Sequence, residues 1–288
     1  MHITDIMKTH NPAFSLEFFP PKSDEGAAQL FNTLRAVKRL NPTFVSVTYG
    51  AGGGTRDRTL QIVEQAKSNI GLESAAHLTC VGHSRTEIKQ ILDELNRAGV
   101  ENVVALRGDL PRGETRFVPS PDGFRYASEL TAFIRSSSYP FCIAVAGYPE
   151  GHIDAPNRET DWAHLEEKVK AGADLIITQL FFENADFYSF EKHMRDLGVS
   201  IPIIPGIMPI TNFQQILRFT KMCGASIPNR VVSDLEAIQH EPELVHRYGV
   251  ELATKQCLDL LGHGVPGIHF YTLNKSRATQ EIISRITA

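Results

Sequence analysis

The chain alternates short runs of apolar residues with longer segments in which apolar positions recur at helical spacing. Between residues 88 and 95, isoleucine or leucine occurs at i, i+3, i+4 and i+7, which places four apolar side chains on one helix face. Leu165, Val169 and Ala173 continue a similar pattern at i, i+4 and i+8. The apolar runs between such segments predict eight strands, at Phe14–Phe19, Phe44–Tyr49, Ser74–Cys80, Asn102–Arg107, Cys142–Tyr148, Leu175–Phe181, Ile201–Ile207 and Gly267–Leu273.

The regular order of strand and helix predicts the fold class. Glycines typical of helix C-caps stand before several of the strands, at Gly71, Gly99, Gly172 and Gly198. Eight strand–helix units in one chain favour an α/β fold with a closed parallel sheet, the (β/α)8 or TIM barrel. A doubly wound open sheet is the alternative.

The connection between the seventh and eighth predicted strands is unusually long. It contains two segments with helical patterning, Phe213–Cys223 and Glu241–Leu261, and Pro228 lies between them. Because no Pro/Ser-rich linker or charge run divides the chain, we interpret this stretch as an extra helical insertion. We therefore expect a single catalytic barrel domain over residues 1–288.

Composition narrows the class of protein. The chain has 42% apolar and 22% charged residues, and its 29 basic and 33 acidic residues give a net charge of −4. These values are typical of a globular protein, and the slight acidic excess argues against nucleic-acid binding. No apolar run is long enough to cross a membrane, and the first residues do not read as a secretory signal. Four widely spaced cysteines predict reduced thiols and a cytoplasmic location.

Polar residues gather where the predicted strands end. The catalytic residues of (β/α)8 barrels lie at the carboxyl ends of the strands. An unpaired charge buried there would be costly, so these side chains predict a polar cleft. These polar side chains predict acid–base chemistry on a polar small molecule, but they do not indicate a particular cofactor. The residues are Glu17, Thr48, Tyr49, Gly50, His77, Arg107, Gly108, Asp109, Tyr148, Pro149, Glu150, Gln179 and Tyr271–Lys275.

Glu17 is the first candidate catalytic residue. It lies between Leu16 and Phe18, and a carboxyl in aromatic surroundings should have a raised pKa, since burial disfavours its charged form. A raised pKa suits a general acid near neutral pH. The alternative is a structural glutamate in a salt bridge at the barrel end.

The turn Arg107-Gly108-Asp109 is the second candidate. It could hold a phosphate or polarise a heterocycle, and the alternative is an ion pair within the turn. The glycine-rich segment Gly50–Gly54 lacks the P-loop pattern and the full dinucleotide fingerprint, so it is equally consistent with a flexible substrate-facing loop. His77 and His152 have no metal-ligand spacing, so we expect no metal site, and a core role is an alternative for His77.

Six strings of residues, in order along the chain, closely resemble methylenetetrahydrofolate reductases of the bacterial single-domain type. They are Ser15–Pro21, Phe44–Gly53, Ala76–Cys80, Val104–Asp109, Ile204–Pro209 and His269–Asn274. The resemblance implies a TIM-barrel flavoprotein with non-covalent FAD. NADH or NADPH would reduce the flavin and leave. 5,10-Methylenetetrahydrofolate would then bind and be reduced to 5-methyltetrahydrofolate for methionine synthesis, in a ping-pong sequence.

The resemblance also implies roles for individual residues. Glu17 would protonate the folate nitrogen, and Asp109 would lie near both flavin and pterin. The other residues implied in substrate binding are Gln179, Gln215, Phe219, Tyr271 and Lys275. The residues implied in flavin binding are Thr48, His77, Leu106, Arg107, Gly108, Asp109, Tyr148, His152, Asp161, His164, Lys168 and Ala173.

Some features depart from the family pattern or stay open. Lys275 stands where some relatives have arginine, and His164 where a relative has asparagine. The resemblance implies small-molecule partners, no membrane, no regulatory extension and a homo-oligomer such as a tetramer, and it does not separate NADH from NADPH. Two other functions remain: another flavin-dependent barrel oxidoreductase, similar to proline dehydrogenase, and a catalytically inactive paralogue serving as a binding or assembly subunit.

Overall fold

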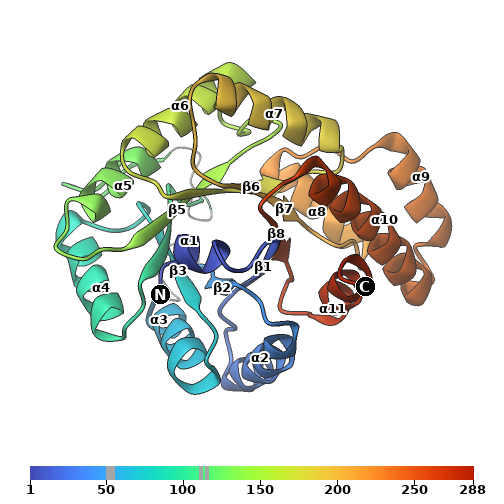
Figure 1. The fold of residues 1–288 in the computed structure, drawn as a ribbon, viewed down its shortest axis with the longest axis horizontal. Coiled ribbons are helices and arrows are strands. Elements are labelled where there is room, and N and C mark those ends of the chain that lie inside the picture. Colours follow the sequence, from blue (N-terminus) through green and yellow to red (C-terminus); the bar gives the residue numbers. More distant parts are fainter. Residues whose placement is uncertain (50–55, 110–112, 114–116) are drawn as a thin grey trace.

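The computed structural model describes residues 1–49, 56–109, 113 and 117–288, and these form a closed parallel barrel (Figure 1). Its strand order is β1-β2-β3-β4-β5-β6-β7-β8, and β1 closes the ring on β8 with Ser15 opposite His269. The strands are β1 Ala13–Phe18, β2 Phe44–Val47, β3 Ser74–Thr79, β4 Asn102–Leu106, β5 Cys142–Gly147, β6 Leu175–Leu180, β7 Ile203–Ile207 and β8 Gly267–Tyr271. The prediction of a (β/α)8 barrel is confirmed.

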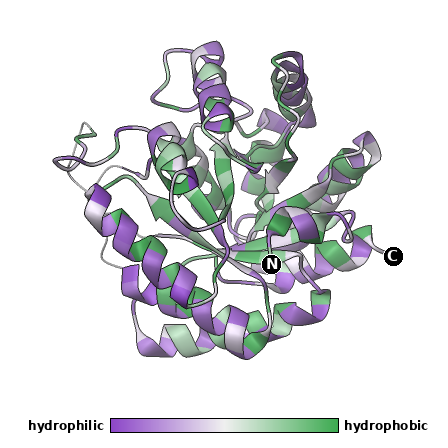
Figure 2. Cartoon of the chain, turned by 60° about the vertical axis from the view of Figure 1, so that its left-hand side comes forward, coloured by the Kyte–Doolittle hydropathy of each residue, from purple (hydrophilic) through white to green (hydrophobic). Residues whose placement is uncertain are grey.

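Helices surround the ring of strands, with polar residues on their outer faces and apolar residues toward the strands (Figure 2). In α4, the four periodic residues identified in the sequence are all buried, and Ser84 begins the helix with a capping box to Glu87. The outer helices are α2 Asp24–Val37, α3 Arg56–Gln65 with the π-helical turn Ala66–Ile70, α4 Arg85–Arg97, α5 Ala127–Arg135, α6 Arg158–Lys170, α7 Asn184–Asp196 and α11 Arg277–Ile286.

The long connection between β7 and β8 holds three helices. The two predicted segments form α8 Phe213–Cys223 and α10 Pro242–His263, and a further helix, α9 Asn229–Ile238, occupies the segment around Pro228. These helices share a separate apolar cluster that includes Phe213, Ile216 and Leu235. The helical insertion is therefore confirmed, although α9 was not expected.

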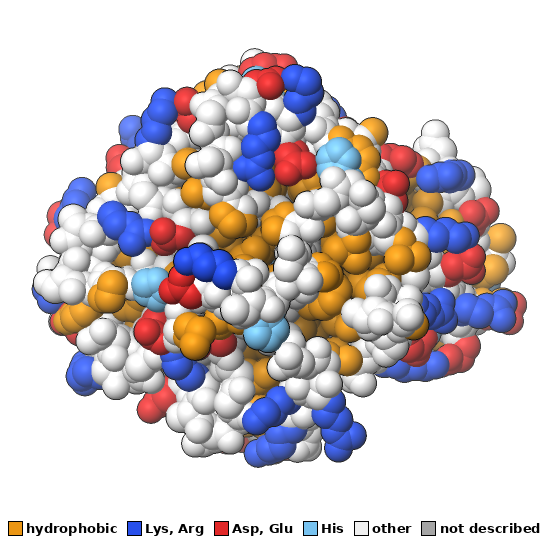
Figure 3. Space-filling model, viewed as in Figure 1, with side chains coloured by type: hydrophobic (Ala, Val, Ile, Leu, Met, Phe, Trp, Pro, Cys, Tyr) orange, Lys and Arg blue, Asp and Glu red, His pale blue; other side chains and the backbone are white. Residues whose placement is uncertain are grey.

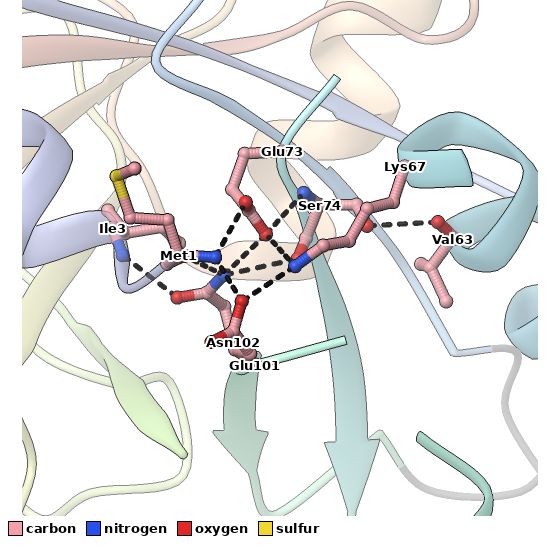
Figure 4. A network of polar contacts seen from close by, with 8 residues as sticks. All are labelled: Met1, Ile3, Val63, Lys67, Glu73, Ser74, Glu101 and Asn102. Carbon is pink, nitrogen blue, oxygen red and sulfur yellow. Dashed lines mark hydrogen bonds and ion pairs between the residues drawn. The ribbon is translucent and has the colours of Figure 1, made fainter. Parts of the chain in front are cut away.

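A short helix that the sequence analysis did not identify, α1 Ile3–Met7, closes the end of the barrel where the strands begin (Figure 1). Ile3 packs among side chains inside the barrel, and its N–H donates to Oδ1 of the buried Asn102 at 2.9 Å. Glu73, Glu101 and Lys67 extend this polar network around the amino group of Met1 (Figure 4). With this end closed, the opposite end is left for a ligand.

The view from the α1 end shows charged side chains mainly toward the periphery, over the outer helices, with apolar side chains gathered nearer the middle (Figure 3). None of the helices in the described part of the chain is long and apolar enough to cross a membrane.

Candidate active site at the carboxyl ends of the strands

A cavity of about 660 Å³ opens at the carboxyl ends of the strands, opposite α1. Its volume lies within the usual range for a small-molecule site. The loops and strand ends of the barrel supply its walls, as the fold class predicts. The lining residues that the sequence analysis also identified are Glu17, Thr48, Tyr49, His77, Leu106, Arg107, Gly108, Asp109, Tyr148, His152, Asp161, His164, Lys168, Gln179 and Tyr271.

Glu17 points into the barrel from β1 and is flanked by two imidazoles. Its Oε2 lies 3.3 Å from Nε2 of His77 and 3.6 Å from Nε2 of His269, and its side chain is 20% exposed. Burial by itself would raise the pKa of Glu17. The charge of His77 and hydrogen bonding from both histidines outweigh burial and lower this pKa to about 2. The expectation of a raised pKa for Glu17 is therefore wrong, because the sequence did not reveal the histidine partners.

Tyr271 and Gln179 line the same cavity as Glu17, at the ends of β8 and β6. The hydroxyl of Tyr271 donates to the carbonyl oxygen of Thr178 at 2.6 Å. Burial, followed by the charge of Glu17, raises the pKa of Tyr271 far above its ordinary value, so this hydroxyl stays protonated. The β6–β7 register shifts between Ile177 and Leu180, and such irregularities commonly re-aim side chains near active sites.

Arg107 does not pair with Asp109 in the turn that contains both. Its guanidinium donates to Oδ2 of Asp154 at 2.7 Å, and this hydrogen bond holds the pKa of Asp154 below its usual value. Gly108 has φ of +90°, and a Cβ there would lie 2.9 Å from side-chain atoms of Thr79 and Val81. The turn thus needs glycine, and it presents the exposed carboxylate of Asp109 at the cavity.

Lys168 places a second cation on the cavity wall from α6. Its Nζ donates to the carbonyl oxygen of Ala146 at 2.5 Å. Burial lowers the pKa of Lys168 to about 8, against the opposing influence of Asp161. Tyr148 lies beneath this amine, 6.0 Å from ring centre to Nζ, and the indole N–H of Trp162 donates to the Tyr148 carbonyl at 2.9 Å.

Four of the residues implied in flavin or substrate binding do not line the cavity. Ala173 lies in the turn between α6 and β6, where the strand begins, so it belongs to the opposite end of the barrel from the cavity. Its assignment to flavin binding stays a prediction that the position of the residue does not favour. Gln215 and Phe219 lie on α8, and Lys275 is exposed beyond β8, all outside the cavity lining. The glycine-rich segment Gly50–Gly54 lies outside the described residues.

The structure adds residues that the sequence analysis missed. Tyr126, Ala127 and Ser128 bring the start of α5 to the cavity, and Asp154 forms the ion pair with Arg107. No strand-end signal marks these positions, because they lie at a helix start or within a long loop. His269 was visible in the string His269–Asn274, but its approach to Glu17 depends on the closure of β8 onto β1.

This geometry defines the class of protein. A closed (β/α)8 barrel whose cavity at the strand ends combines a carboxyl, imidazoles and two cations has the architecture of a barrel enzyme. Residues 2–287 match the family model described as methylenetetrahydrofolate reductase. The chain therefore belongs to the methylenetetrahydrofolate reductase family.

Individual relatives agree with this assignment. The chain is 37% identical over 268 residues to 5,10-methylenetetrahydrofolate reductase of Salmonella typhimurium, covering 93% of this chain and 88% of the relative. It is 39% identical over 295 residues to methylenetetrahydrofolate reductase (NADH) 1 of Arabidopsis thaliana, covering 99% of this chain. The chain spans about half the length of that plant relative.

A solved structure is also similar in fold. An uncharacterised Clostridium thermocellum protein, described as binding two copies of 5-methyl-5,6,7,8-tetrahydrofolic acid, has a TM-score of 0.71 with 15% identity. The match covers 99% of this chain and 98% of that one. At this identity the likeness concerns the fold.

Proposed function

We propose that the protein reduces 5,10-methylenetetrahydrofolate to 5-methyltetrahydrofolate, with FAD as the bound cofactor and NADH or NADPH as the electron donor. The observation that carries the proposal is the Glu17–His77 pair in the same cavity as Arg107 and Lys168. The pair offers a proton for ring opening, and the two cations offer charge for a pyrophosphate. The family assignment supports both substrate and reaction.

The residues present fit a flavin dinucleotide. Arg107 has the fork that suits bidentate phosphate contact, and Lys168 adds a second positive charge on another wall of the cavity. Gly108 lines the cavity in the turn between Arg107 and Asp109. When bound, FAD would supply stepwise hydride transfer, which none of the protein's own side chains can perform.

The remaining steps fall to the chain's own residues. The carboxyl of Glu17 lies 3.3 Å from the imidazole of His77, and this pair rather than the carboxyl alone would act as the acid. A ligand that fills the cavity excludes water from this pair. Exclusion of water favours the neutral form of the pair, in which the carboxyl of Glu17 carries the proton. Glu17 would then deliver this proton to the folate nitrogen. The carboxylate of Asp109 would accept N–H donors of the pterin.

An absorption experiment tests this function. The purified protein, loaded with FAD, should lose its flavin band on anaerobic addition of NADH or NADPH and regain it on addition of methylenetetrahydrofolate. A band that bleaches but does not return with the folate would favour another flavin-dependent barrel oxidoreductase. A protein that binds no FAD would favour an inactive paralogue that serves as a binding subunit. The ping-pong order, the homo-oligomeric state and the cytoplasmic location stay predictions.

Replacing Lys168 by methionine should weaken FAD binding while sparing the fold. A lost charge-assisted contact is worth roughly 1.5–3 kcal/mol, so we expect affinity for FAD to fall about tenfold to hundredfold. Stability of the FAD-free protein should stay the same or rise, because burial of the amine is unfavourable. Fluorescence titration with FAD and urea unfolding measure the two effects.

Lys170→Met is the matched control, since this exposed lysine on the same helix pairs with Glu166. Equal FAD affinity in Lys168→Met and wild type would contradict the role given to Lys168.

A further inference from the structure

Asp154 occupies the guanidinium to which the proposed function gives a phosphate. Its Oδ2 accepts a hydrogen bond from one terminal nitrogen of Arg107 at 2.7 Å, and both side chains line the cavity. Arg107 directly follows β4, and Asp154 lies in the loop after the neighbouring strand β5, so the pair joins two adjacent strand ends. An anionic ligand that approaches Arg107 therefore meets a carboxylate that is already bound there.

The charge of the cavity wall makes this carboxylate an obstacle to a diphosphate. The hydrogen bond from Arg107 holds the pKa of Asp154 below its usual value, so Asp154 is negative at neutral pH. Burial, followed by the charge of Arg107, lowers the pKa of His152, so this neighbouring imidazole adds no positive charge. The described lining has two lysine or arginine side chains against five carboxyl groups, which are Glu17, Asp109, Asp154, Asp161 and Glu167.

The loop that carries Asp154 is held by contacts other than the ion pair. The N–H of Asp154 donates to Nδ1 of His152 at 3.0 Å, and the N–H of Ala155 donates to the carbonyl oxygen of His152 at 2.9 Å. Both carboxylate oxygens of Glu150 accept from the N–H of Ser226, between α8 and α9. The side chain of Asp154 is 51% exposed. It can therefore turn into solvent while the backbone of the loop stays in place.

Arg107 can accept a second anion before Asp154 leaves. In the described part of the chain, Asp154 is the one hydrogen-bond acceptor of its guanidinium, and the ring of Phe117 lies 5.7 Å from Cζ. A guanidinium has five N–H donors in a planar fork, so several of them remain for a ligand oxygen. The ion pair thus fixes the direction of a long side chain and still leaves donors for a phosphate.

We propose that Asp154 is a positioning residue that holds Arg107 at the cavity while the cavity is empty and gives way to the diphosphate of the cofactor. The inference rests on the proposed function, which makes a flavin dinucleotide the ligand. Asp154 then affects two states in opposite directions. It stabilises the ligand-free protein through the ion pair, and it weakens cofactor binding because that ion pair must break first.

Titration of the FAD-free protein with FAD tests the role of Asp154. Asparagine keeps the size of the side chain and one acceptor oxygen but removes the charge. From the usual contribution of an exposed ion pair, we expect FAD to bind Asp154→Asn about fivefold more tightly than wild type. Riboflavin, which has no phosphate, should bind both proteins equally. Without FAD, Asp154→Asn should unfold at a slightly lower urea concentration than wild type.

Two further variants control the interpretation. Asp24→Asn breaks a matched pair outside the cavity lining, since Asp24 accepts from Arg58 at 2.7 Å and Arg58 is 29% exposed, like Arg107. This variant should bind FAD with wild-type affinity. In an Arg107→Gln background, Asp154→Asn should change FAD affinity by less than about twofold, because Asp154 acts through Arg107.

Inorganic pyrophosphate separates this inference from the proposed function. Calorimetry should show tighter binding of pyrophosphate to Asp154→Asn than to wild type. If wild type binds pyrophosphate but not FAD, the proposed function fails, and the comparison of the two proteins still decides the role of Asp154. Equal or weaker binding of FAD and pyrophosphate by Asp154→Asn would overturn the inference. Failure of both proteins to bind either ligand would overturn the inference and the proposed function together.

Discussion

Glu17→Gln should stop reduction of methylenetetrahydrofolate while leaving reduction of the flavin by NADH nearly unchanged. Glutamine matches the size of glutamate but carries no exchangeable acid proton, and general acid catalysis typically contributes 10²–10⁴-fold. We therefore expect the folate half-reaction to slow by about a thousandfold. Stopped-flow absorbance of the flavin band measures each half-reaction separately.

Glu281→Gln is the matched control, because Glu281 also pairs with an imidazole, that of His246, but on the outer helices α10 and α11. Both half-reactions should keep their rates in this variant. If Glu17→Gln reduced the folate at the wild-type rate, the proton would have to come from elsewhere, and the acid role of the Glu17–His77 pair would be wrong.

Gly206→Ala should damage both the fold and the site. A Cβ at Gly206 in β7 would lie 2.1 Å from the carbonyl oxygen of Thr178 and 2.7 Å from the ring of Tyr271. Since that carbonyl accepts the Tyr271 hydroxyl, either β6 or the tyrosine must move. Clashes with backbone in a packed core belong to the most destabilising substitutions, so we expect a loss of about 4 kcal/mol in the free energy of unfolding. Urea unfolding measures this loss.

Gly262→Ala is a control for which we expect the opposite change in the free energy of unfolding. Gly262 lies in α10, and a Cβ at this position would have no other atom within 4 Å. Alanine favours helix over glycine by about 0.5–1 kcal/mol. This variant should therefore be slightly more stable than wild type. If Gly206→Ala instead kept the stability and flavin content of wild type, β6 and β7 could move apart without cost. That result would contradict the close packing of Gly206 against Thr178 and Tyr271.

Periodicity was sufficient for the barrel because each strand is short, apolar and followed by an amphipathic helix. The structure moves strand ends by only a residue or two, as for Phe14–Phe19 and β1 Ala13–Phe18. Periodicity did not predict α1, because its five residues are too few to show a helical repeat. It also did not predict α9, whose pattern was obscured by Pro228. Both helices depend on tertiary packing, α1 against side chains inside the barrel and α9 in the apolar cluster with α8 and α10, and local sequence does not encode such packing.

The site was predictable where function follows strand ends and unpredictable where it depends on pairing across the barrel. Asp109 and Gln179 line the cavity at the strand ends from which they were identified. The state of Glu17 was misjudged, since its neighbours in sequence are aromatic but its neighbours in space are His77 and His269. Ala173 lies outside the cavity for a related reason: it precedes a strand, and residues before strands face the end that α1 closes.

The hydrogen bond from Trp162 to the backbone of Tyr148 has a practical consequence. Trp162 is the one tryptophan of the chain, it is 6% exposed, and its indole is tied to a residue of the cavity wall. Tryptophan emission therefore comes from a single, known position in the structure. An isoalloxazine ring in the cavity absorbs where indole emits, so its arrival would quench the tryptophan emission by resonance energy transfer. Binding of the proposed FAD could thus be followed through this tryptophan, with no label attached.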